Sequence, residues 1–322
     1  MPSISVIIPA YRPCDFDDLR RSIEANSEVD AEWIVVDDGS GPKYDAVFDA
    51  LPEFVTVLRQ AENRGQGAAR NAGLKLARGK WIKFLDADDE LDKGHLRALL
   101  KATCEIQDNT IPFASTRHVF ANGHTHDNVS WRDLEATPEA QLTRLLHAPF
   151  LHHCGAIFPR GLLERLGGYG EGLETDEDGD LLIRVLLSGY VFTPVKGVHY
   201  LYFHHNSGNR VSSDGSAAKL AARLRVCDRV EAAFADGGQG MPQAVRKGLA
   251  LRLDKIALSY WHADRAAARA ALERARALCP GYHAPGRWPL RILRTIGGHY
   301  AVLAATAVFR SVRGRPKGGM QG

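Results

Sequence analysis

Two groups of aspartates have the residue types and positions that a cation-assisted diphosphate site requires. Asp37-Asp38-Gly39-Ser40 follows an apolar run at 33–36, and Asp86-Ala87-Asp88-Asp89 follows a second apolar run at 81–85. Ligands of an open parallel sheet bind just beyond the carboxyl ends of its strands, so these carboxylates would face the ligand. Acids alone repel a phosphate, but Mg²⁺ or Mn²⁺ held by one or two carboxylates binds phosphate oxygens well. The two groups therefore predict a site for a diphosphate and a divalent cation.

Each group also has an interpretation that involves no chemistry. Asp and Gly are common in turns, so residues 37–40 taken alone fit a strand-ending turn equally well. Three acids within residues 86–89 repel one another unless water or a cation separates them, and one such group could be a solvated loop. We favour the binding site because both groups follow expected parallel strands.

A third acidic segment, residues 174–180, opens an expected helix at 177–187. Acids are stabilised at a helix N-terminus by the helix dipole, so a capping role is the alternative here. The same dipole would keep one of these carboxylates ionised, as a general base for a sugar hydroxyl requires. Arg184 lies six residues after Asp178 and could form an ion pair with it.

Two further features are less specific. Residues 63–73 place glycines ahead of an expected helix, which fits either close packing on the sheet or backbone N–H groups and Arg70 facing a nucleotide. No GxGxxG motif follows the first expected strand, which disfavours a dinucleotide site. Several of the thirteen histidines cluster, and His204-His205-Asn206 could reach a diphosphate or its metal, although an isolated histidine usually has a structural role.

The first two-thirds of the chain contain the elements that must position these residues. Strand-like runs at 4–8, 33–37, 55–58 and 81–86 alternate with helix-like segments at 16–28, after Gly65 and at 91–106. This alternation predicts an α/β domain with a parallel sheet covered on both faces, whose first strand stops at Pro9. Further strands are expected at 113–119, 156–158, 191–195 and 198–203, with a polar loop or lid at 121–135.

From about Ser216 the composition shifts to Ala, Arg and Leu, and residues 217–234, 242–260 and 264–278 have helical patterns. We therefore expect three regions: a catalytic domain at 1–215, a C-terminal helical appendage at 216–282 and a basic amphipathic tail at 283–322.

Composition bounds the class of protein. The chain has 322 residues, of which 25% are charged, as in globular proteins with one large domain and an appendage or with two domains. Five scattered cysteines without a CxxC pair argue against a zinc framework and a disulfide scaffold, and favour a reducing cytosol. The N-terminus lacks signal-peptide features, and no apolar run reaches the roughly 18 residues of a membrane span. The tail holds seven Lys or Arg and no acid, so the basic excess is not a nucleic-acid face on the main domain.

In their order and spacing, these motifs resemble the family 2 glycosyltransferases, a hexosyltransferase-type family with the GT-A fold. The resemblance spans roughly residues 3–212 and rests on six motifs. The matching segments are SVIIPAY at 5–11, VVDDGS at 35–40, NRG at 63–65 with ARNAG at 69–73, FLDADD at 84–89, GGY at 167–169 and EDGDLLIR at 177–184.

The resemblance implies a role for individual residues. Those implied to line the nucleotide pocket are Pro9, Ala10, Tyr11, Asp37, Asp38, Arg70 and Asp86. Asp88 would bind Mg²⁺ or Mn²⁺ as part of the DxD motif, and Asp178, the acid of the family's ED motif, would be the general base. Family members often carry an arginine after the closing strand. Phe203 stands near that position here, so His205 and Arg210 are implied as the diphosphate ligands.

The reaction implied is an inverting transfer from a nucleotide-sugar donor, expected to be UDP-linked, to the hydroxyl of a glycan or lipid-linked acceptor. Such reactions build cell-surface polysaccharides and glycolipids. One alternative is a sugar-nucleotide nucleotidyltransferase, which is disfavoured because Pro9-Ala10-Tyr11 stands where a glycine-rich basic loop would be needed. The other is a non-catalytic glycan- or nucleotide-sugar-binding module, which the intact acids in all three groups disfavour.

The tail leaves two interpretations open. Apolar and aromatic residues alternate with arginines at 287–296, and the apolar stretch at 300–309 is too short to span a bilayer. Such a segment suits either the interface of an anionic membrane or a helix packed on the catalytic domain with a basic end. A lipid-carried acceptor favours the first. We therefore expect a cytoplasmic protein held peripherally at the inner face of the cell membrane.

Overall fold

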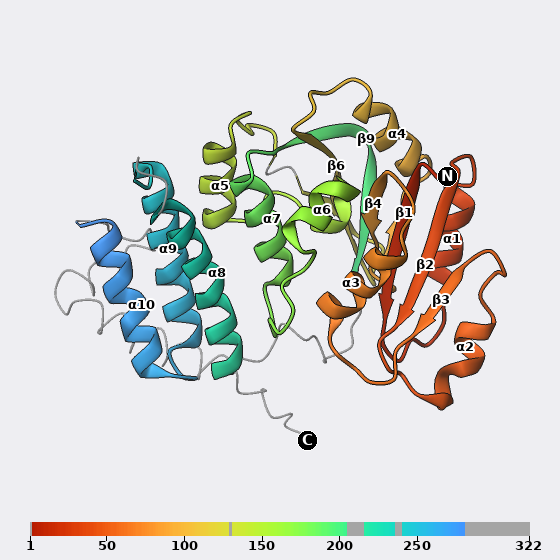
Figure 1. Cartoon of the computed structure of the whole chain (residues 1–322), viewed down its shortest axis with the longest axis horizontal. Coiled ribbons are helices and arrows are strands. Elements are labelled where there is room, and N and C mark those ends of the chain that lie inside the picture. Colours follow the sequence, from red (N-terminus) through yellow and green to blue (C-terminus); the bar gives the residue numbers. More distant parts are fainter. Residues whose placement is uncertain (1, 129–130, 205–215, 236–239, 281–322) are drawn as a thin grey trace, which may run out of the picture. The chain divides into compact units, whose positions relative to one another are not determined.

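The computed structural model describes residues 2–128, 131–204, 216–235 and 240–280. The chain divides into two compact units, Met1–Arg210 and Val211–Gly322. The first unit contains two β-sheets with their helices, and the described part of the second consists of helices α8 (Ala217–Ala235), α9 (Gln243–Tyr260) and α10 (Arg265–Leu278) (Figure 1). The expected mostly parallel sheet with flanking helices and a helical C-terminal region is confirmed.

The first sheet has the strand order β3 (Thr56–Arg59), β2 (Ala31–Asp37), β1 (Ile4–Ala10), β4 (Trp81–Phe84) and β8 (Ile157–Pro159). Strands β1 to β4 are parallel, and β8 joins antiparallel to β4. Every residue of β1 is buried, as expected when helices cover both faces of a sheet. This arrangement brings the carboxyl ends of β1, β2 and β4 to one edge.

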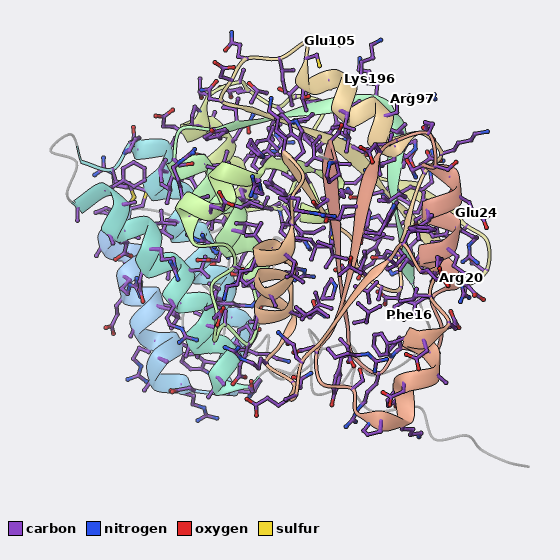
Figure 2. The ribbon with its side chains drawn as sticks, turned by 45° about the vertical axis from the view of Figure 1, so that its right-hand side comes forward. Phe16, Arg20, Glu24, Arg97, Glu105 and Lys196 are labelled. Carbon is purple, nitrogen blue, oxygen red and sulfur yellow. The ribbon has the colours of Figure 1, made fainter. Side chains whose placement is uncertain are left out.

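Helix α3 (Gln66–Leu76) packs directly on β1 and β2, and α1 (Asp17–Ala25) lies on the other side of the sheet (Figure 1). The approach of α3 is close, because a Cβ at Gly73 would lie 2.5 Å from Ile7 Cγ2. Arg20 and Glu24 project from the side of α1 that faces away from the sheet (Figure 2).

The expectation that the first strand stops at Pro9 was wrong, because β1 continues to Ala10 and Pro9 is in register with Val36 of β2. Proline lacks the N–H that a central strand normally donates. On the opposite side, however, pairing with β4 ends at Ile7 and Phe84. Pro9 lies past that end of the ladder, so proline is tolerated there.

The second sheet has the order β5 (Glu90–Leu91), β9 (Val191–His204), β6 (Thr110–Phe120) and β7 (Thr125–Asp127). Strands β6 and β9 pair in parallel, with an irregularity in β9 opposite Ala114 and Ser115. The two strands expected at 191–195 and 198–203 are therefore one irregular strand, and the expected loop at 121–135 contains β7. Helix α4 (His95–Thr103) packs on β6 and β9.

Shorter elements complete the first unit. They are α2 (Asp45–Asp49), α5 (Pro138–His147), α6 (Arg160–Leu166), α7 (Glu177–Leu187) and the single 3₁₀ turns η1 (Pro42–Tyr44) and η2 (His153–Gly155). Helix α7 packs against α5 and α6. In the second unit, α9 packs against both α8 and α10. None of the helices in the described ranges has the length and apolar character needed to cross a membrane.

Candidate active site

The first acidic group closes the carboxyl end of β2. Asp37 Oδ1 accepts a hydrogen bond from Ser40 N at 2.8 Å, so this segment is indeed a turn. The two oxygens of Asp38 accept from the backbone N–H groups of Arg64 and Gly65, each at 2.9 Å. Burial raises the pKa of Asp38, and these N–H donors offset the rise only in part. Asp38 thus anchors the loop that leads into α3 beside the end of β2.

The expected nucleotide-pocket residues at the end of β1 lie beside this turn. Ala10 O accepts from Asp38 N at 2.9 Å, which ties the end of β1 to the first acidic group. Tyr11 is 45% exposed, and the guanidinium of Arg12 lies 4.8 Å from its ring centroid. An exposed aromatic ring next to buried carboxylates gives this edge a surface on which a planar base can stack.

Arg70 joins the second and third acidic groups. Its side chain is only 1% exposed, and Nη2 lies 2.7 Å from Asp86 Oδ1 and 3.1 Å from Gln66 Oε1. Its Nη1 lies 3.5 Å from Asp178 Oδ1. Burial alone would raise the pKa of Asp86, but Arg70, His153 and His152 together outweigh it and the net shift is downward. The structure therefore places Arg70 between Asp86 and Asp178, which are far apart in the sequence.

Asp88 and Asp89 have different surroundings. Asp88 is exposed at the edge of the sheet, whereas Asp89 is buried. Asp89 accepts from the hydroxyl of Tyr200 and, at 2.8 Å, from Phe203 N. Burial and the nearby Asp86 raise the pKa of Asp89 well above its usual range. Asp89 thus connects the turn after β4 to β9, while Asp88 faces solvent.

Asp178 stands in the first turn of α7, with its side chain 38% exposed. Its Oδ2 lies 3.2 Å from His153 Nδ1. Burial would raise the pKa of Asp178, but His153 and then Arg70 outweigh it and hold the pKa well below its usual range. Asp178 is therefore an ionised carboxylate that solvent can reach.

The suggested ion pair between Arg184 and Asp178 does not form. Arg184 Nε instead donates to Asp180 Oδ2 at 2.8 Å, one helical turn away. The remaining guanidinium nitrogens donate to Leu166 O at 2.9 Å and to Gly168 O at 2.7 Å. Arg184 therefore fixes the loop that precedes α7, and Arg70 is the arginine that reaches Asp178.

The sequence did not reveal the roles of His152, which caps the η2 turn, and of His153 and Cys154 within it. Their side chains and Asp86 present ligand atoms that all lie within 4.8 Å of one another, so this group could hold a metal ion. Burial lowers the pKa of His152 to about 4 and raises that of Cys154 well above its usual range. The ring of His152 is therefore neutral and Cys154 is a thiol. His205 and Arg210, like the tail at 283–322, lie outside the described residues.

Comparison with known proteins decides the class. Residues 5–167 match the family model described as glycosyl transferase family 2. The chain belongs to this family. As a family 2 glycosyltransferase it is an enzyme, which confirms the expectation from its motifs and leaves both alternatives without support.

Two relatives illustrate the setting of this family 2 glycosyltransferase. The succinoglycan biosynthesis protein ExoO of Rhizobium meliloti is 30% identical over 214 residues, which are 63% of this chain and 61% of ExoO. A GalNAc(5)-diNAcBac-PP-undecaprenol β-1,3-glucosyltransferase of Campylobacter jejuni is 30% identical over 51% of this chain and 54% of its own length. The matches therefore span somewhat more than half of these relatives.

Solved structures support the fold. One is S. aureus TarS, residues 1–349, in complex with UDP-GlcNAc. Its TM-score is 0.67 at 19% sequence identity, and the match covers 96% of this chain and 92% of the TarS chain. The mannosyltransferase PcManGT from Pyrobaculum calidifontis, in complex with GDP-Man and Mn²⁺, has a TM-score of 0.53 at 20% identity, over 98% of this chain and 88% of its own. At these identities the likeness concerns the fold alone, and it confirms the GT-A expectation.

Proposed function

We propose that this family 2 glycosyltransferase moves a sugar, with inversion, from a UDP-linked donor to a hydroxyl of a glycan or lipid-linked acceptor. The observation that supports this most directly is the shared contact of Asp86 and Asp178 with Arg70. Through this contact Asp86, which follows strand β4, lies next to Asp178, an ionised acid in the first turn of α7. Relatives named for succinoglycan biosynthesis and for an undecaprenol-linked acceptor support a role in cell-surface polysaccharide or glycolipid synthesis.

The donor would bind at the sheet edge formed by β1, β2 and β4. We assign its base to the exposed ring of Tyr11, which follows the buried Pro9 and Ala10 at the end of β1 and lies beside Asp37 and Asp38. The ribose would contact Asp86, and Arg70 would hold that carboxylate in place. TarS, which shares this fold, was solved in complex with UDP-GlcNAc, so the fold is compatible with the UDP-sugar donor that the motifs imply.

A divalent cation fits the exposed carboxylate of Asp88. Carboxylate oxygens are hard ligands of the kind that Mg²⁺ and Mn²⁺ prefer, and such a cation would neutralise charge on the departing diphosphate. The group of Asp86, His152, His153 and Cys154 is less suitable for these cations, because Arg70 already neutralises Asp86 and the other three residues offer nitrogen and sulfur ligands. Asp88 is therefore the residue to which we assign the cation.

Asp178 would act as the general base that removes the proton from the acceptor hydroxyl. The carboxylate is ionised, and its partial exposure leaves room for an incoming hydroxyl. A strongly lowered pKa also makes a carboxylate a weak base in the resting enzyme. Proton transfer therefore has to occur as the new bond forms, when the hydroxyl becomes acidic.

Two substitutions test this assignment. The Asp178→Asn variant should bind UDP in the presence of Mn²⁺ as the wild type does. Its turnover of nucleotide sugars, measured over a panel with added Mn²⁺, should fall by about 10²- to 10⁴-fold. Asp88→Ala should lose the Mn²⁺-dependent part of UDP binding measured by calorimetry. Glu174→Gln, at an exposed acid of the same segment, serves as the control and should change neither. Wild-type turnover by Asp178→Asn would overturn the base, and unchanged Mn²⁺-dependent affinity of Asp88→Ala would overturn the cation site.

Peripheral contact with an anionic membrane is a separate proposal and rests on the sequence of the tail. Replacing Arg310, Arg313 and Arg315 by glutamine should reduce co-sedimentation of the full chain with anionic vesicles, because each basic residue near such a surface contributes about 1 kcal/mol. High salt should have the same effect on the unmodified chain. Equal recovery of both proteins with the vesicles at low salt would contradict this.

A further inference from the structure

His153 occupies a buried position between two functional groups. Its side chain is 1% exposed, and the ring packs near Phe84 and Tyr169, with centroids 6.3 and 6.0 Å away. On one side Nδ1 lies 3.2 Å from Asp178 Oδ2, and on the other Nε2 lies 3.1 Å from Cys154 Sγ. Each ring nitrogen of His153 therefore faces a polar side chain.

The partners determine where the imidazole proton resides. A bare Nδ1 would place its lone pair against the ionised Asp178 oxygen, with no proton between two acceptors 3.2 Å apart. Cys154 remains a thiol and can donate its S–H to a bare Nε2. Both contacts are satisfied only when Nδ1 carries the proton. In the resting geometry Nδ1 is near Asp178 but not aligned as a hydrogen bond, and such bonds commonly tighten when substrate binds.

Cys154 contacts His153 and His153 contacts Asp178, but these three residues do not form a nucleophilic triad. A cysteine nucleophile has to be a reachable thiolate, usually with a lowered pKa. Cys154 is fully buried, and burial together with Asp86 raises its pKa well above the usual range. Donation therefore runs in the opposite direction, from the thiol to the imidazole and from the imidazole to the carboxylate.

We infer that His153 is a positioning residue that orients the Asp178 carboxylate through Nδ1–H, with Cys154 fixing the tautomer of His153. The inference deepens the proposed function, since it rests on Asp178 as the base. Orientation matters because a carboxylate that rotates freely spends little time aligned with the acceptor hydroxyl. The other titratable or charged groups around Asp178 are Arg70, Asp86, His152, Tyr169 and Glu177.

The tautomer can be measured without any substrate. In the full chain labelled with ¹⁵N-histidine, the signals that disappear in His153→Asn identify His153. At neutral pH they should show a protonated Nδ1 and a bare Nε2, and Cys154→Ala should alter them more than Cys154→Ser, which keeps a donor. A bare Nδ1, or an imidazolium protonated on both nitrogens, would overturn the inference.

Activity provides the second arm, with UDP-glucose and UDP-GlcNAc hydrolysis in Mn²⁺ as probes. His153→Phe keeps the ring but loses the donor, and kcat should fall about 10- to 100-fold, as when partners that orient a functional ligand are removed. KM for the donor should stay within about twofold of the wild-type value. Because the donor stabilises ionised Asp178, its loss should also move the acid limb of the kcat profile to higher pH.

A conservative variant and a cross-check separate the possible failures. His153→Asn places an amide N–H near the position of Nδ1 and should recover most of kcat and the acid limb. If Asp178→Asn is inactive while His153→Phe retains wild-type kcat and pH profile, the positioning role is wrong and the base assignment stands. If Asp178→Asn is active, Asp178 is not the general base, and that part of the proposed function is wrong.

Discussion

Replacing Arg70 by methionine should destabilise the first unit far more than removing an exposed arginine at the same ion-pair distance. Arg70 is 1% exposed and lies 2.7 Å from Asp86 and 3.5 Å from Asp178. Removing one partner of a buried pair costs about 3–5 kcal/mol, because the remaining charge is left uncompensated. Asp86 and Asp178 retain 22% and 38% exposure, so water screens part of this cost. We expect a loss of about 3 kcal/mol in the free energy of unfolding.

Arg78 provides the matched control. Its Nε also lies 2.7 Å from a carboxylate, Glu32, but the Arg78 side chain is 69% exposed. Glu32 would keep its hydrogen bonds from Ser5 Oγ and from the Arg78 backbone N–H. The Glu32 side chain is only 8% exposed, but these two donors stay in place and water can replace the exposed guanidinium, so Arg78→Met should cost about 1 kcal/mol.

Urea unfolding followed by tryptophan fluorescence and circular dichroism measures both variants. Trp33 and Trp81 lie on the two strands beside β1 and report on the first unit, and an unchanged m-value would confirm that the same transition is compared. Adding Asp86→Asn to Arg70→Met should recover about 1 kcal/mol or more, because no unpaired acid then remains at that position. Equal losses for Arg70→Met and Arg78→Met would refute the reasoning from burial.

Two further predictions concern stability. Gly168→Ala should lower the free energy of unfolding in urea by about 2 kcal/mol or more, because φ at Gly168 is +70° and a Cβ there would lie 2.2 Å from Asn71 Oδ1. Gly172 has a similar φ of +74°, but a Cβ there would meet open space, so Gly172→Ala should cost only about 1 kcal/mol. A similar loss for both would show that the Asn71 contact is unimportant. Burial lowers the pKa of Lys83 from 10.5 to about 7, so between these values the unfolded chain binds a proton that the folded chain has released. Stability should therefore rise with pH in that window, by up to about 1.4 kcal/mol per unit, and Lys83→Met should abolish this rise between pH 7 and 9. The same slope in wild type and variant would contradict the assignment.

Local sequence patterns predicted much of the fold because the elements of the first sheet form from contiguous residues. The helix expected at 177–187 has those bounds, and both aspartate groups follow strands as expected. Pro9 was misjudged because strand tolerance depends on where the neighbouring β4 ends, which no local pattern records. For the same reason the sequence did not reveal that 191–204 is a single strand paired with β6.

The candidate site was predictable in its acids but not in their partners. Asp37, Asp86 and Asp178 could be selected because carboxylates after strands or at a helix start have a chemical meaning by themselves. His153 could not, since its role depends on a contact with Asp178 across the fold, and Asp89 was expected to face the ligand but is buried against Tyr200. Lys83 was counted within an ordinary strand, and only the structure shows that it is fully buried.

The parallel pairing of β6 with β9 has a consequence for how the protein folds. Residues 121–190 separate the two strands, so their ladder can close only after a long loop has been ordered. The pairs β1–β2 and β2–β3 join residues only 27 and 22 positions apart, as in Ile4 with Ala31 and Ile34 with Thr56, and can form earlier. An intermediate in which only β1 to β3 have paired would expose the unpaired edges of β6 and β9, including the segment that binds Asp89. Aggregation during expression or refolding should therefore arise from this late step, and lower temperature or slower synthesis should increase the soluble yield.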